Sequence, residues 1–171
     1  MKFNYLWFLA VSGMVCVSAV QAKAPRLNET EQLGKQLFFE TRLSSPAGQS
    51  CATCHAPERA FTDPRQGLPV SAGAAQGMFT SRNSPSVMYL RKVPKLHIDK
   101  KEGIYMGGLF YDGRANSLEQ QIDGPAFSPN EMAIKDKAEL VNQLRKLGYE
   151  EKFKHIYGAS ALTTDESGYR Q

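Results

Sequence analysis

Two cysteines followed directly by a histidine constrain this chain more than any other feature. Residues 51–55 read Cys-Ala-Thr-Cys-His. Two thiols at this spacing can add to the two vinyl groups of a haem, and the adjacent imidazole then reaches the iron from the same short helical turn. The motif therefore predicts covalently bound haem c, with Cys51 and Cys54 as attachment residues and His55 as an axial ligand of the iron.

Three other uses of a C-x-x-C pair fit the sequence less well. Zinc would need two more ligands at sensible spacing, and His97 and His155 are isolated from each other and from any further cysteine. A thioredoxin-like redox pair calls for a βαβ pattern nearby, and we see none. A plain disulfide stays open as an alternative in an exported chain.

The N-terminus is typical of a secretory signal peptide. Lys2 provides a positive start, residues 6–20 are apolar, and residues 20–22 form a small-residue cleavage pattern. The apolar run is too short and wrongly flanked for a membrane span. We therefore expect residues 1–22 to be removed, and the mature chain, residues 23–171, to be periplasmic with no stable membrane insertion.

The charge of the mature chain argues against nucleic acid as its partner. Without the signal peptide, 20 basic and 17 acidic residues remain, a mildly basic balance. About 149 residues are enough for one domain with one core. Part of the positive charge is clustered between positions 91 and 101. This basic stretch could dock an acidic electron donor or be an ordinary solvated loop. Its basic residues are Arg91, Lys92, Lys95, Lys100 and Lys101.

The spacing of apolar residues predicts helices. In residues 28–41, Leu33 and Leu37 recur at helical spacing behind a polar cap at Asn28 or Thr30. This face suits packing against a haem. We expect a helix over this range.

The second half of the chain repeats the helical signal. Residues 116–122 begin a short helix behind a polar cap. Residues 134–158 form two amphipathic helical segments separated by Gly148, which offers a stop. The first segment places Leu144 and its apolar neighbours on one face.

Between these helices, residues 62–110 are rich in Gly, Pro and Ser and show no sustained periodicity. A loop of that length is usually functional, and here we expect it to wrap the edge of the cofactor. We see no hairpin signal. The fold class is therefore predicted as all-α, a cytochrome c-like helical domain with long loops around one covalently bound haem.

The ligand opposite His55 is open at this point. A methionine would make an electron-transfer haem, whereas an open position would let peroxide reach the iron. Each candidate taken alone is more often core filler or a surface residue than a ligand. The candidates are Met78, Met88, Met106, Met132, His97 and His155.

Several segments together carry a family resemblance. They read "LGKQLFFETRLSSPAGQSCATCHAPERAFTD", then "SRNSPSV", then "GGLFYDGRANSLEQQIDGPAFSPNEM". They resemble the N-terminal domain of bacterial dihaem cytochrome c peroxidases, and the MauG-type group is the most similar. The resemblance covers residues 33 to about 165. It implies a peroxidase domain that reduces hydrogen peroxide with electrons from a small periplasmic cytochrome c or cupredoxin, or a MauG-like haem oxidase.

The resemblance also implies roles for individual residues. His55 is similar to the proximal ligand of the haem that reacts with peroxide, and Gln121 and Glu131 match the polar pair of the distal pocket. A glutamate suits that place, because cleaving an O–O bond requires a proton to move from the inner to the outer oxygen. The alternative for Glu131 is a carboxylate at a helix start behind Asn130. Gln121 could equally be an exposed helix residue.

Two further residues are placed by the same resemblance. Arg114 is expected to pair with a haem propionate, for which its forked guanidinium is suited. Asn83 resembles a residue that helps to bind a calcium ion between two domains.

The chain departs from the family pattern in three places. Classical family members carry a histidine before the "RN.P" segment, but only Met78 stands there. The pocket is therefore either open, as the MauG-like resemblance implies, or capped by Met78. Tyr111 replaces a tryptophan that lies between two haems, and a tyrosine can also relay charge. No second C-x-x-C-H motif is present, so we expect a truncated chain that lacks the second haem domain. A non-catalytic mono-haem electron-transfer module is the alternative function.

Overall fold

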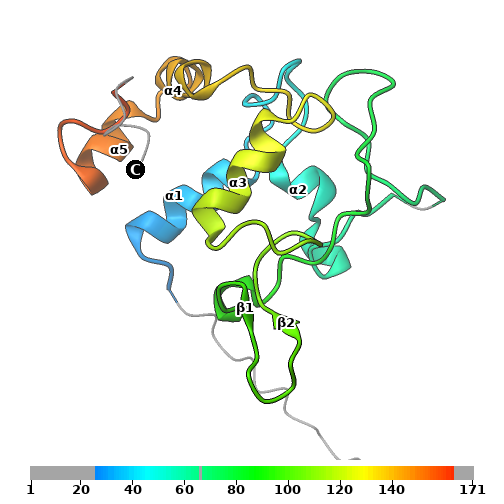
Figure 1. The fold of residues 1–171 in the computed structure, drawn as a ribbon. Helices are drawn as coiled ribbons and strands as arrows, with labels where there is room; N and C mark the ends of the chain where they lie inside the picture. Colours follow the sequence, from blue (N-terminus) through cyan, green and yellow to red (C-terminus); the bar gives the residue numbers. More distant parts are fainter. Residues whose placement is uncertain (1–25, 66, 164–171) are drawn as a thin grey trace, which may run out of the picture.

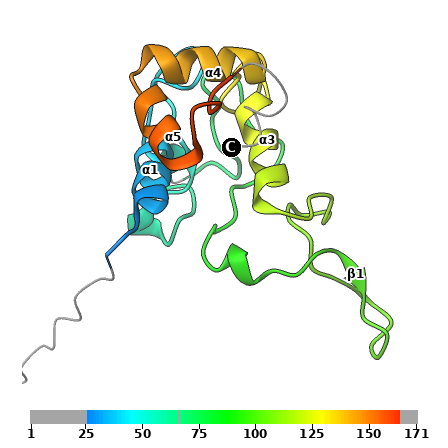
Figure 2. The same ribbon diagram turned by 90° about the vertical axis from the view of Figure 1, so that its left-hand side faces the viewer.

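The computed structural model describes residues 26–65 and 67–163, so the expected signal peptide, residues 1–22, lies outside it. The elements in chain order are α1 Glu29–Phe38, α2 Cys51–Cys54, the 3-10 turns η1 Pro57–Arg59 and η2 Leu90–Lys92, β1 His97–Ile98, β2 Tyr105–Met106, α3 Leu118–Phe127, α4 Lys137–Lys146 and α5 Glu150–Tyr157. Helices make up the body, and the β1–β2 hairpin projects from it (Figures 1 and 2).

Helix α1 begins where the sequence predicts. Asn28 is its N-cap, accepting from the Glu31 backbone N–H at 2.8 Å, while the Glu31 carboxylate accepts from the Asn28 N–H at 2.8 Å. This reciprocal pair satisfies two backbone donors that a helix start otherwise leaves without partners. Leu33 is the buried residue of the helix.

Helices α4 and α5 confirm the prediction for residues 134–158. Asp136 caps α4 by accepting from the Glu139 N–H at 2.8 Å, and Val141 and Leu144 face the core. Gly148 has φ +81°, a left-handed conformation that costs glycine little, and α5 starts two residues later.

One buried apolar cluster joins these helices. It contains Leu33, Leu43, Ala126, Met132, Ile134, Val141, Leu144, Tyr149, Phe153, Ala161 and Leu162. Because its members come from both ends of the described chain, the first and last helices are packed into one unit. Within the described residues, no helix is long and apolar enough to cross a membrane.

A buried carboxylate connects the end of α1 to the α4–α5 junction. Glu40 accepts hydrogen bonds from the Tyr149 hydroxyl at 2.8 Å and from Arg42 Nε at 2.7 Å. Arg42 Nη2 also lies 2.5 Å from Glu40 Oε2. These bonds lower the pKa of Glu40 from 4.5 to about 2, with Arg42 as the main cause and burial acting in the opposite direction.

The all-α prediction is wrong at the hairpin. Strands β1 and β2 pair antiparallel, His97 opposite Met106 and Ile98 opposite Tyr105. Each strand has only two residues, which is too short to show a period-two pattern in the sequence. The turn is made by Asp99, whose carboxylate accepts the backbone N–H groups of Lys101 and Glu102 at 2.8 and 2.9 Å.

Helix α3 is also longer than predicted. The sequence predicted a short helix that begins within residues 116–122. The structure continues to Phe127 with Pro125 inside the helix. Pro125 lies in the last turn, where its missing N–H leaves out only one helical hydrogen bond.

Candidate functional site

The C-x-x-C-H motif forms a single helical turn. Ser50 precedes α2, and its backbone N–H donates to Thr53 Oγ1 at 2.9 Å while its carbonyl accepts from the Thr53 N–H at 3.1 Å. The turn brings Cys51 and Cys54 to the same side, and both thiols are free rather than joined in a disulfide. Burial raises the pKa of the Cys51 thiol.

His55 ends this turn with its ring orientation already set. Its backbone N–H donates to the Cys51 carbonyl at 2.9 Å, and its Nδ1 lies 3.1 Å from the Phe61 carbonyl oxygen. A carbonyl oxygen only accepts, so Nδ1 carries the ring proton and Nε2 keeps its lone pair. Metal-bound histidines usually hold their second nitrogen in this way, so the turn fits a haem iron at Nε2.

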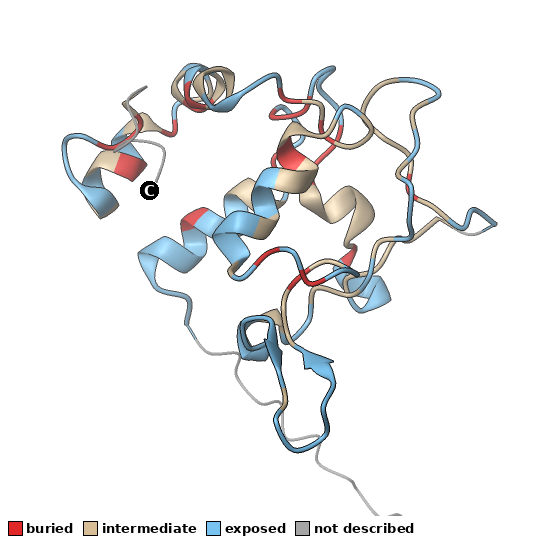
Figure 3. Cartoon of the chain, viewed as in Figure 1, coloured by how far each residue is buried: buried red, intermediate tan, exposed pale blue. Residues whose placement is uncertain are grey.

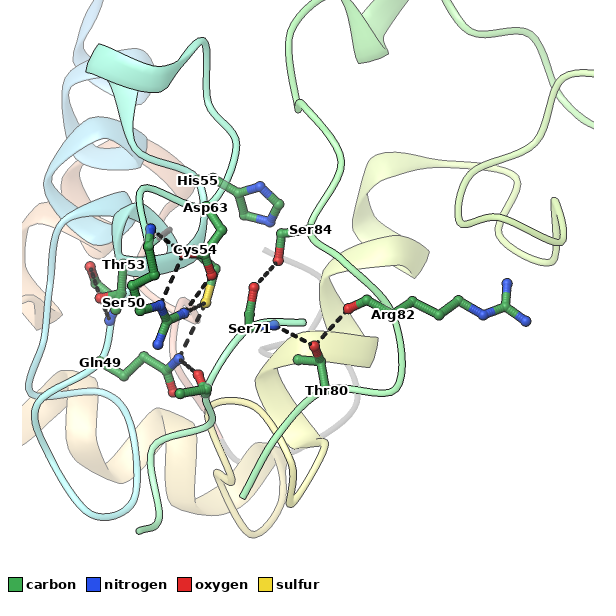
Figure 4. Close-up of polar contacts among 12 residues, drawn as sticks. Gln49, Ser50, Thr53, Cys54, His55, Asp63, Ser71, Thr80, Arg82 and Ser84 are labelled. Carbon is green, nitrogen blue, oxygen red and sulfur yellow. Dashed lines mark hydrogen bonds and ion pairs between the residues drawn. The ribbon is translucent and has the colours of Figure 1, made fainter. Parts of the chain in front are cut away.

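Polar side chains that the sequence reading missed surround Cys54 (Figure 4). Gln49 Nε2 lies 3.3 Å and Arg65 Nη2 lies 3.5 Å from Cys54 Sγ. Arg65 also holds Asp63 through Nη2 at 2.5 Å and Nε at 2.9 Å. Although burial raises it, the pKa of Asp63 falls from 3.8 to about 2, because Arg65 and Ser71 donate hydrogen bonds to the carboxylate.

The segment around Ser84 lies beside the motif. Ser84 and the fully buried Ser71 share a hydrogen bond of 2.7 Å, and Ser86 donates to the Ala60 carbonyl at 2.6 Å. Figure 4 shows the Ser71–Ser84 hydrogen bond. A cavity of about 420 Å³ opens here, lined by parts of residues 62–71, by residues 83–86 and by Tyr111.

Glu131 lies in the turn that follows α3. The alternative placing it at a helix start is wrong, since α4 begins at Lys137 behind Asp136. Its carbonyl accepts from the Ala74 N–H at 2.7 Å. Burial raises the pKa of the half-buried Glu131 carboxyl, and the positive charge of Arg114 opposes that rise.

Met78 belongs to a segment that packs against the same turn. The Gly73 N–H donates to the Met78 carbonyl at 2.8 Å. A Cβ on Gly73 would lie 2.8 Å from the Asn130 carbonyl carbon and 3.2 Å from Met78 Cβ. The missing side chain therefore lets the Met78 segment approach the turn that carries Glu131.

The other candidates for the sixth ligand lie elsewhere. Met132 is part of the buried core, and Met106 and His97 are exposed on the hairpin. His155 is exposed on α5, with Nε2 3.2 Å from Glu29 Oε2. Met88 is also exposed. Met78 is thus the partly buried candidate outside the core whose segment packs against the turn that carries Glu131.

Arg114 lies in the segment between the hairpin and α3, and Gln121 lies on α3. The Arg114 guanidinium stacks 3.5 Å above the Phe110 ring centre and binds both Asp112 oxygens at 2.9 Å. Phe110 in turn packs on Gly124 of α3, where an added Cβ would lie 2.6 Å from its Cζ. Gln121 is half-buried on the same helix.

Tyr111 and Asn83 are brought together although they lie 28 residues apart. The Tyr111 hydroxyl donates a short hydrogen bond to Asn83 Oδ1 and lies 3.3 Å from the Asn83 carbonyl oxygen. Over residues 26–65 and 67–163, no three His, Cys, Asp or Glu side chains gather closely enough to hold a metal ion.

Several known proteins are similar to this chain in sequence or in fold. Residues 28–169 match the family described as di-haem cytochrome c peroxidase. The methylamine utilization protein MauG of Paracoccus denitrificans is 41% identical over 94% of this chain and 42% of its own length. The cytochrome c551 peroxidase of Nitrosomonas europaea is 29% identical over 87% of this chain and 40% of its own length.

The fold of this chain is also similar to that of a solved structure. The diheme peroxidase BthA from Burkholderia thailandensis superposes with a TM-score of 0.71 at 33% identity, covering 86% of this chain and 37% of that one. The chain thus spans less than half the length of each of these relatives.

Proposed function

Because the chain belongs to the di-haem cytochrome c peroxidase family, we propose that residues 23–171 form a periplasmic haem c domain that reduces hydrogen peroxide with electrons from a small cytochrome c or cupredoxin. A MauG-like haem oxidase that uses peroxide to modify a protein belongs to the same proposal. The observation that carries it is Glu131, a half-buried carboxylate whose pKa is raised by burial and which caps no helix.

The motif at the start of the domain would hold one haem. Cys51 and Cys54 would form the thioether bonds, and His55 would bind the iron through Nε2, because Nδ1 donates to the Phe61 carbonyl. When bound, haem c supplies the redox chemistry that cleaves the O–O bond of peroxide. The role of Arg114 toward a propionate belongs to this proposal too, although its guanidinium is paired with Asp112 here.

Glu131 would move a proton during the reaction. A carboxylate poised at the distal face can accept the proton of the inner peroxide oxygen and return it to the outer oxygen, which then leaves as water. Partial burial favours the protonated form of Glu131, while Arg114 favours the ionised form. Gln121 would orient the bound peroxide by hydrogen bonding.

Tyr111 would relay electrons from outside the domain. Oxidation of a phenol lowers the affinity of its oxygen for the proton, and the Tyr111 proton already points at Asn83 Oδ1. An interdomain calcium ion bound by Asn83 belongs to this proposal as well, and it would lie close to the Tyr111 hydroxyl.

Glu131→Gln tests the proposal. We expect the second-order reaction of the haem-loaded protein with peroxide to slow by about 10²–10⁴-fold, the usual contribution of an acid–base group. The resting visible spectrum should stay the same, since Glu131 is not a ligand. Glu151→Gln, at a side chain that is 87% exposed on α5, is the matched control and should react like the wild type. Equal rates for both variants would refute the role of Glu131.

The alternative function is a mono-haem electron-transfer module, and the position of Met78 beside the Glu131 turn is the observation that favours it. The two functions predict different spectra. An open iron is high-spin, whereas His–Met ligation is low-spin. If Met78→Ala converts a low-spin spectrum to a high-spin one, Met78 caps the iron and the electron-transfer function is the better one. We expect Met78→Ala to leave a high-spin spectrum unchanged.

A further inference from the structure

Cys54 Sγ, one of the two sulfurs that would carry the haem, lies beside two hydrogen-bond donors. Gln49 Nε2 is 3.3 Å from it (Figure 4), and Arg65 Nη2 is 3.5 Å from it. A thiol or thioether sulfur is only a weak acceptor, so these contacts add little stability. What Arg65 brings to this place is a permanent positive charge, because a guanidinium does not lose its proton in proteins.

Asp63 holds the guanidinium of Arg65 in its position beside Cys54. Asp63 Oδ1 accepts from the backbone N–H and from Nε of Arg65 at 2.8 and 2.9 Å, and Oδ2 accepts from Nη2 at 2.5 Å. The nitrogen that faces the sulfur therefore also binds the carboxylate. Planar pairing through two bonds fixes the direction of the guanidinium as well as its position.

The Asp63–Arg65 pair is partly withdrawn from water. The Arg65 side chain is 32% and the Asp63 side chain 15% exposed, and Figure 3 shows the neighbouring helix α2 in the colour of intermediate burial. Burial disfavours the ionised form, but hydrogen bonds from Arg65 and Ser71 hold the pKa of Asp63 at about 2, so both partners are charged at neutral pH. Salt and water screen such charges less than charges on the surface.

Charges beside a haem change its reduction potential. Reduction by one electron lowers the charge of the haem by one, so a nearby cation favours the reduced state and a nearby anion the oxidised state. We propose that Arg65 raises the reduction potential of the haem bound at Cys54, and that Asp63, by pairing with Arg65, limits that rise. This proposal rests on the proposed function, because it requires the haem held by Cys51, Cys54 and His55.

A purely structural role for the pair predicts a different result. If Arg65 and Asp63 only fastened their loop to the motif, removing either partner would break the same hydrogen bonds, and both variants would change the protein in the same direction. Two charges of opposite sign instead shift the potential in opposite directions. The sign of the shift therefore separates the two roles.

Spectroelectrochemical titration of the haem-loaded chain at pH 7 tests the proposal. At a fixed electrode potential, we expect Arg65→Gln to lower the ratio of reduced to oxidised haem by about three- to tenfold, which corresponds to roughly 30–60 mV for one electron. Asp63→Asn should raise the ratio by a similar factor. Arg65→Lys keeps the positive charge without the forked pairing and should stay closer to the wild type than Arg65→Gln does.

Arg91→Gln is the matched control, because it makes the same change at an exposed residue of η2 and should leave the potential unchanged. The resting spectra of all variants should agree, since none of these residues is an axial ligand. The proposal is overturned if Arg65→Gln and Asp63→Asn shift the potential in the same direction, or if neither shifts it more than Arg91→Gln. If Arg65→Gln takes up no haem, Asp63→Asn decides by whether it raises the potential.

The reaction of the same proteins with peroxide is measured separately. Opposite shifts of potential in a chain that does not react with peroxide would refute the proposed function and leave the role of Arg65 intact. A reaction that depends on Glu131, without the shifts of potential, would refute only the role of Arg65.

Discussion

Replacing Glu40 by glutamine should destabilise the fold in a way that depends on pH. Glu40 is only 8% exposed and joins the end of α1 to Tyr149 at the start of α5. The glutamine keeps the size of the side chain and can still accept from the Tyr149 hydroxyl. It removes the negative charge that holds Arg42, whose Nη2 lies 2.5 Å from the carboxylate.

The size of the effect follows from the pKa. Folding lowers the pKa of Glu40 from 4.5 to about 2, and each unit corresponds to about 1.4 kcal/mol, so the full linkage is roughly 3 kcal/mol. The Arg42 side chain is 59% exposed, and solvent screens its attraction to the carboxylate. We therefore expect Glu40→Gln to lower the free energy of unfolding by about 2 kcal/mol at pH 7.

The sign of the pH dependence is set by the direction of the shift. The folded protein binds the Glu40 proton more weakly than the unfolded chain, so the stabilisation is fully present above about pH 5 and is lost as pH falls from 4.5 toward 2. Urea unfolding followed by circular dichroism, from neutral to acid pH, measures it. The difference between wild type and variant should shrink steadily over that window.

A control variant separates this network from general effects of charge. Glu151→Gln changes the net charge equally but lies on the surface of α5, and its unfolding curves should match those of the wild type. If Glu40→Gln costs the same at pH 2.5 as at pH 7, its effect comes from packing, and the reasoning from the ionised carboxylate fails.

Two further predictions concern the haem motif and the β1–β2 hairpin. Haem should stay attached to the wild-type chain through denaturing electrophoresis and be lost from Cys51→Ala/Cys54→Ala; loss from the wild type would contradict covalent attachment. Gly107→Ala should destabilise the base of the β1–β2 hairpin by about 1–3 kcal/mol, because Gly107 has φ +78° and an added Cβ would clash with the Pro94 carbonyl oxygen. Faster amide hydrogen exchange over β1 and β2 would show it, while equal exchange would contradict it.

The parts of the fold that could be predicted are those coded by neighbouring residues. The Asn28 cap and the Gly148 stop act over three or four positions, and the helices at 29–38 and 137–157 follow from them. The hairpin could not be predicted in the same way. Its two-residue strands show no alternation, and its base depends on Gly107 meeting Pro94, a contact that local patterns do not encode.

In the candidate site, too, features that depend on neighbouring residues could be predicted, and features that depend on other contacts could not. Cys51, Cys54 and His55 are adjacent in sequence, so the chemistry of the motif could be inferred directly. The carbonyl that holds His55 Nδ1 could not, because any residue can supply one and Phe61 carries no signal of it. Asp63 and Arg65 did carry a signal that was missed. Opposite charges two residues apart, shortly after a haem motif, indicate a local ion pair near the cofactor.

Glu131 shows why a local pattern can mislead at a functional position. Asn130 before Glu131 resembles a helix start, yet Asp136 followed by Glu139 provides the cap that the chain uses, and α4 begins there. Glu131 therefore lies in a turn, where its backbone carbonyl accepts from the Ala74 N–H. Its carboxylate is not at the N-terminus of a helix and gains no stabilisation from a helix dipole. A half-buried carboxylate without a capping role lowers the stability of the fold, and proteins tend to retain such residues at functional positions. The failure of the structural explanation for Glu131 is therefore itself an argument for the catalytic one.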